Sequence, residues 1–159
     1  MALLAGKVFL QWIPAEDPEK AGAIGGHMTV GVLIGLLLLV RLWLRLTTSK
    51  PPKASTGNAL LDTIGQATHG VFYLLVAAMV LTGLASALGG GYLGLLAGEP
   101  LQLPAGYKEA VTMQLHAIVS SLLILLIVLH FAAAMYHQFF LKDKIMGRMW
   151  TGSRDAGDL

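Results

Sequence analysis

Three long runs of apolar residues divide the chain, and polar or Gly- and Pro-rich segments separate them. The runs cover residues 21–46, about 60–88 and 113–142, while residues 14–20, 47–58 and 89–111 form the predicted connections. Each run exceeds the roughly 20 residues that an α-helix needs to cross a hydrocarbon layer about 30 Å thick. The pattern predicts three complete transmembrane helices.

A fourth apolar segment, residues 1–13, is too short to span, because a helix of this length reaches only about 20 Å. It is either the outer half of a transmembrane helix whose inner half is absent, or a short interfacial helix. The interfacial alternative places Trp12 at the headgroups and extends Lys7 toward water. The predicted fold class is all-α: a transmembrane four-helix bundle with three complete spans plus a partial N-terminal helix.

Composition supports the membrane assignment and excludes several chemistries. The chain is 55% hydrophobic and only 13% charged, whereas soluble domains contain about 25% charged residues. The basic residues lie beside apolar runs and not in a solvated patch, so nucleic acid is not a predicted partner. Because the chain has no Cys, it lacks disulfides, iron–sulfur clusters and the thiols that attach haem covalently.

The distribution of bases predicts the orientation in the membrane. Eight of the 11 Lys and Arg residues lie at the end of, or after, the runs 21–46 and 113–142. Since such bases are retained on the cytoplasmic side, residues 47–58 and the C-terminus are predicted to be cytoplasmic. Residues 14–26 and 89–111 then face outward. We divide the chain into a membrane domain, residues 1–149, and a cytoplasmic tail, residues 150–159.

The last apolar run carries three histidines, His116, His130 and His137, at spacings of 14 and 7 residues. In an α-helix these spacings fall about 40° and 20° short of whole turns, so the three imidazoles share one stripe. His116 and His130 lie about 21 Å apart along the axis, one toward each side of the hydrocarbon layer.

His27 lies near the outer end of its span, at the same depth as His116. Ionisable groups inside a membrane are costly and mark functional sites. Two imidazoles on facing helices, with apolar walls and glycines between them, suit the axial ligation of haem b. With a histidine at both axial positions of the iron, we predict electron transfer and not bond-making chemistry. We therefore predict no catalytic residue.

His130 is predicted to ligate a second haem, which makes His27, His116 and His130 the predicted metal ligands. His69 is a possible partner for His130, although its depth is not matched. His69 and His137 are interpreted as accessory groups that form hydrogen bonds, contact a propionate or a quinone, or relay protons.

Two arginines follow on the same helix as His27. Arg41 comes 14 residues later, hence on the same face and about 21 Å inward. It either binds a haem propionate at the inner site or extends to the cytoplasmic headgroups. For Arg45 we expect the headgroup position.

Three sequence stretches resemble the bacterial cytochrome b561 family. They are HMTVGVLIGLLLLVRLWLRL, HGVFYLLVAAMVLTGL and LHAIVSSLLILLIVLHFAAAMYHQFFLKDKIMGRM. The resemblance implies two b haems, the outer one held by His27 and His116. It implies that the inner one is held by His130 and a first-helix histidine in an H-W-L sequence. This chain has no such histidine, so we expect it to begin within that helix, with His27 and His116 as its one complete axial pair.

The resemblance also implies a location and a role. The protein is expected in the bacterial inner membrane, surrounded by lipid, passing electrons between quinone or quinol and a redox partner. Ubiquinone is a candidate cofactor, and the choice between an electron carrier and a quinone-linked oxidoreductase stays open, as does a homodimer. One alternative is the cytochrome b subunit that anchors a hydrogenase or dehydrogenase. Another is a haem-free proton or metal transporter that uses the histidines.

Overall fold

The structure is a computed structural model that describes residues 10, 13–14, 17–49, 58–90, 94, 97–100 and 110–141. Three long helices dominate these residues: α3 (Pro18–Thr47), α4 (Ala59–Gly89) and α6 (Val111–Tyr136), which continues into the π-helix η3 (His137–Leu141). All three are long and apolar enough to cross a membrane. The three predicted spans are confirmed. The predicted partial helix of residues 1–13 and the boundary at residue 149 lie outside the described residues, apart from Leu10 and Ile13.

Polar residues next to α3 and α4 fix where these two helices begin. The Asp17 carboxylate accepts a hydrogen bond of 2.9 Å from the Glu19 amide, and Pro18 occupies the first turn. Both features favour a helix start, so α3 begins within the segment predicted to be a polar loop. The Asn58 side chain caps α4 in the same way by accepting from the Leu60 amide at 2.9 Å.

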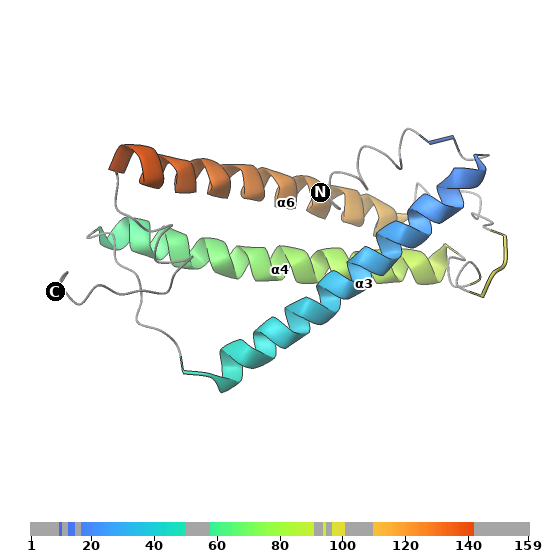
Figure 1. Ribbon diagram of the computed structural model, residues 1–159, viewed down its shortest axis with the longest axis horizontal. Coiled ribbons are helices and arrows are strands. Elements are labelled where there is room, and N and C mark those ends of the chain that lie inside the picture. The colour runs from blue at the N-terminus through green and yellow to red at the C-terminus, as the bar shows by residue number, and fades with distance from the viewer. Residues whose placement is uncertain are drawn as a thin grey trace.

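Two helices lie side by side and the third crosses them. Figure 1 shows α4 and α6 running antiparallel along their length, while α3 crosses α4 and diverges from it toward its own C-terminal end. The crossing is close at Gly35, where a β-carbon would lie 3.1 Å from Cγ1 of Val80. The absence of a side chain at residue 35 therefore allows the two helices to approach.

Few side chains of the described residues are buried, as expected for helices that face lipid. Ile24, Met79, Ala87 and Leu123 are the buried hydrophobic residues. Large apolar side chains such as Leu37 remain mostly exposed, at 67% of the accessible area. A soluble domain would hide such surface, so the exposed apolar faces fit a hydrocarbon surrounding.

Candidate functional site

The first pair of imidazoles joins α3 to α6 near the start of both helices. The ring centroids of His27 and His116 lie 6.1 Å apart, with the ring planes at 83°. Both side chains are partly buried. The structure thus brings together the two histidines that the sequence matched by depth, and we call them the first histidine pair.

Thr82 on α4 fixes the orientation and the tautomer of His116. Its hydroxyl donates to the Ala78 carbonyl at 2.7 Å, and its Oγ1 lies 3.0 Å from Nδ1 of His116. A hydroxyl has one proton to donate, so toward the ring the oxygen acts as the acceptor. This arrangement favours the tautomer with the proton on Nδ1, which leaves the Nε2 lone pair available to a metal. A hydrogen bond from the other ring nitrogen is the usual support of a metal-ligating histidine.

Gly83, the next residue on α4, leaves room for the same ring. A β-carbon there would lie 3.1 Å from Cε1 and 3.4 Å from Nδ1 of His116. Any residue other than glycine would therefore crowd the imidazole. The sequence predicted no role for Thr82 or Gly83, because their proximity to His116 depends on how α4 packs against α6.

The spacing of the first histidine pair fits one metal ion between the two rings. An imidazole nitrogen lies about 2 Å from a bound transition metal, so two such bonds and two ring radii come to about 6 Å. Within the described ranges, no three His, Asp or Glu side chains gather into a metal-binding group. Paired imidazoles without further protein ligands are what an equatorial macrocycle such as haem requires, since it supplies the remaining ligands.

A second pair of imidazoles joins α4 to α6. The ring centroids of His69 and His130 lie 5.6 Å apart, and Phe72 meets the His130 ring edge to face at 5.3 Å. This second histidine pair lies 14 residues from His116 along α6, a rise of about 21 Å. The structure therefore places His69 at the level of His130, closer than the depth estimate from the sequence suggested.

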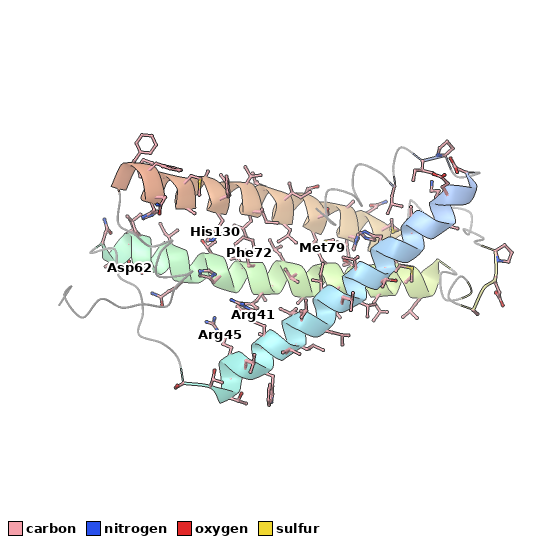
Figure 2. The ribbon with its side chains drawn as sticks, viewed as in Figure 1. Arg41, Arg45, Asp62, Phe72, Met79 and His130 are labelled. Atoms are coloured by element: carbon pink, nitrogen blue, oxygen red, sulfur yellow. The ribbon has the colours of Figure 1, made fainter. Side chains whose placement is uncertain are left out.

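The second histidine pair borders a cavity of about 330 Å³ between the three helices. Its walls are mainly apolar, and its polar lining groups are Arg41, His69, Tyr73 and His130. Figure 2 shows Arg41 and Arg45 extending from α3 toward α4, at about the level of Phe72 and His130. The sequence predicted Arg41 near the inner site, whereas the approach of Arg45 to the same region is visible only in the structure.

His137 lies apart from both histidine pairs. It is the first residue of η3, and its amide reaches the carbonyls of both Ala133 and Ala134. Its ring meets that of Tyr136 at a centroid distance of 6.4 Å. It does not line the cavity at His130, so the structure leaves it outside the two candidate sites.

Fold and site together define a class of protein: an integral membrane protein whose long helices hold two imidazole pairs at two levels of one bundle. This is the arrangement of a membrane cytochrome b. The chain belongs to the prokaryotic cytochrome b561 family, whose model matches residues 1–152. Membership in this family of membrane cytochromes implies haem b as the cofactor.

Two curated proteins are similar over most of their length. Cytochrome b562 of Cereibacter sphaeroides is 27% identical over 158 residues, covering 92% of this chain and 87% of that protein. A probable superoxide oxidase, CybB, of Yersinia pestis is 26% identical over 131 residues, covering 80% of this chain and 74% of that protein. No solved structure matches the chain.

Proposed function

We propose that the protein binds haem b between His27 and His116 and transfers electrons between the quinone pool and a redox partner. The observation that supports this function most strongly is the first histidine pair: two rings 6.1 Å apart, one of them oriented by Thr82. Bound haem would supply one-electron chemistry through its iron. The chain supplies two axial nitrogens, an apolar surrounding and a fixed ring orientation.

His130 is proposed to hold a second haem on the side of the bundle where α3 ends. His69 touches its ring and is proposed as an accessory group beside that haem. With the two sites about 21 Å apart, electrons could cross most of the hydrocarbon layer. The distribution of Lys and Arg supports a cytoplasmic position for this second site and for the C-terminus.

The direct test is the haem content of the purified protein. After expression with an ample haem supply, we expect a Soret band and bis-histidine low-spin spectra. Haem-free, folded protein would refute the cytochrome function and favour the proton or metal transporter. If the pyridine haemochrome assay gives one haem per chain, the first histidine pair accounts for it. If it gives two haems per chain, the second haem requires a further axial ligand besides His130.

A second test concerns the electron donor. In proteoliposomes, a quinol should reduce the haem if the protein exchanges electrons with the quinone pool. The similarity to the probable superoxide oxidase makes superoxide a second donor for the same assay. Co-purification with an iron–sulfur subunit would instead favour the anchor subunit of a hydrogenase or dehydrogenase.

A further inference from the structure

Two arginines of α3 converge on one tyrosine of α4 beside the cavity at His130. Nε of Arg41 donates a hydrogen bond of 2.8 Å to the Tyr73 hydroxyl. The guanidinium carbons of Arg41 and Arg45 lie 5.9 Å and 5.3 Å from the centroid of the Tyr73 ring. Since α3 diverges from α4 in this region (Figure 1), the long arginine side chains bridge the widening space.

These two cations lack a counter-ion among the residues that the structure describes. No carboxylate of those residues pairs with Arg41 or Arg45, and none of them lines the cavity. Contact with an aromatic ring contributes only about 0.5–1 kcal/mol at exposed positions. A guanidinium has five N–H donors, and Arg41 uses one of them on Tyr73. Among the described residues, therefore, most of the donor capacity of the two side chains is not used.

The cavity indicates what kind of anion fits. Its walls are apolar side chains of α3 and α4, such as Leu37 and Val76, with the His130 imidazole on the α6 side. A ligand that fills it needs an apolar body that reaches an imidazole, and anionic groups on the side that faces the arginines of α3. A haem meets both requirements, because its two propionates project from one edge of the macrocycle.

We infer that Arg41 and Arg45 together bind the propionate carboxylates of the haem at His130, and that Tyr73 holds both guanidiniums in place for them. The inference rests on the proposed function. It differs from the sequence-based expectation for Arg45, which assigned that residue to the lipid headgroups. It also makes Tyr73 a positioning residue, with no contact to the iron ligands required.

The test combines protein variants with a modified cofactor. The Arg41→Gln/Arg45→Gln double variant and the wild-type chain are each loaded with haem or with haem dimethyl ester, which lacks the carboxylate charges. The rate of haem transfer from the second site to apomyoglobin is then measured. The haem of the first histidine pair serves as an internal control for folding, and its bands are identified by their loss in His116→Ala.

With natural haem, we expect the double variant to release the second haem about tenfold faster or more, as for the loss of charge-assisted hydrogen bonds. With the dimethyl ester, the two proteins should release it at the same rate. Tyr73→Phe keeps the ring and removes the hydroxyl, so it should give a smaller effect in the same direction. If the double variant does not fold, the Arg41→Lys/Arg45→Lys variant keeps both charges, and its haem-release rate should lie above that of wild type but below the tenfold increase.

Two results would overturn the inference while leaving the proposed function intact. One is an unchanged release rate of natural haem in the double variant. The other is an equal acceleration with haem and with its dimethyl ester, which would show that the arginines bind an anionic lipid phosphate or stabilise the helices. Wild-type protein that binds haem at the first histidine pair alone would also overturn the inference, whereas wild-type protein without any haem would refute the proposed function itself.

Discussion

Thr82 provides a sharp test of how the chain tunes the haem of the first histidine pair. In Thr82→Val the side-chain shape is nearly retained, but Nδ1 of His116 loses the oxygen 3.0 Å away. That hydrogen bond makes the imidazole a stronger donor and stabilises ferric iron. A net hydrogen bond is worth about 0.5–1.5 kcal/mol, and a tenfold change, about 1.4 kcal/mol, equals about 59 mV for one electron. We therefore expect the midpoint potential of this haem to rise by roughly 20–60 mV.

The assay is a potentiometric titration of the purified protein, followed at the α-band. Thr82→Ser keeps the hydroxyl and should retain the wild-type potential. Thr63→Val removes an exposed hydroxyl that only donates to Ala59 on the same helix, so it should also leave the potential unchanged. A Thr82→Val protein with full haem content and an unshifted potential would show that the hydroxyl does not polarise His116.

The remaining predictions concern ligation and packing. His116→Ala should abolish haem at the first histidine pair and largely spare the second site, and His130→Ala should do the converse; optical spectra that lose both haems or neither in both variants would contradict this assignment. Gly83→Ala should lower haem occupancy at the first pair, measured by pyridine haemochrome, because its β-carbon would crowd the His116 ring at 3.1 Å. Gly35→Ala should be less stable than Gly22→Ala by about 1–3 kcal/mol, because residue 35 abuts Val80 and residue 22 has no atom within 4 Å. Thermal unfolding in detergent measures the difference, and equal melting temperatures would argue against close packing of α3 on α4.

The position of the helices could be predicted because the signal is local. Apolar runs and their polar flanks determine a transmembrane helix without reference to any other part of the chain. The start of α3 was placed three residues too late, since residues 18–20 are polar. Pro18 and the Asp17 cap favour the first turn despite that polarity, and average hydropathy does not register such local chemistry.

The candidate site could be predicted only in part. Both His27 and His116 lie near the outer end of their helices. Their equal depth below the same membrane surface was therefore enough to predict that they pair. Depth gave His69 only as an unmatched partner of His130, although the rings lie 5.6 Å apart. Side chains can bridge a small difference in depth, and the offset between two helices is set by how their surfaces pack.

The sequence by itself determined that this is a helical membrane protein with a stripe of histidines, since periodicity and hydropathy follow from the residue order alone. It also placed His27 and His116 at matching depths, because helical rise is constant. The tertiary structure decided which side chains meet them. Thr82 and Gly83 reach His116 through the register of α4 against α6. Arg45 joins Arg41 over Tyr73 because α3 diverges from α4. Such contacts depend on the angle and offset between helices, which residues distant in sequence fix together.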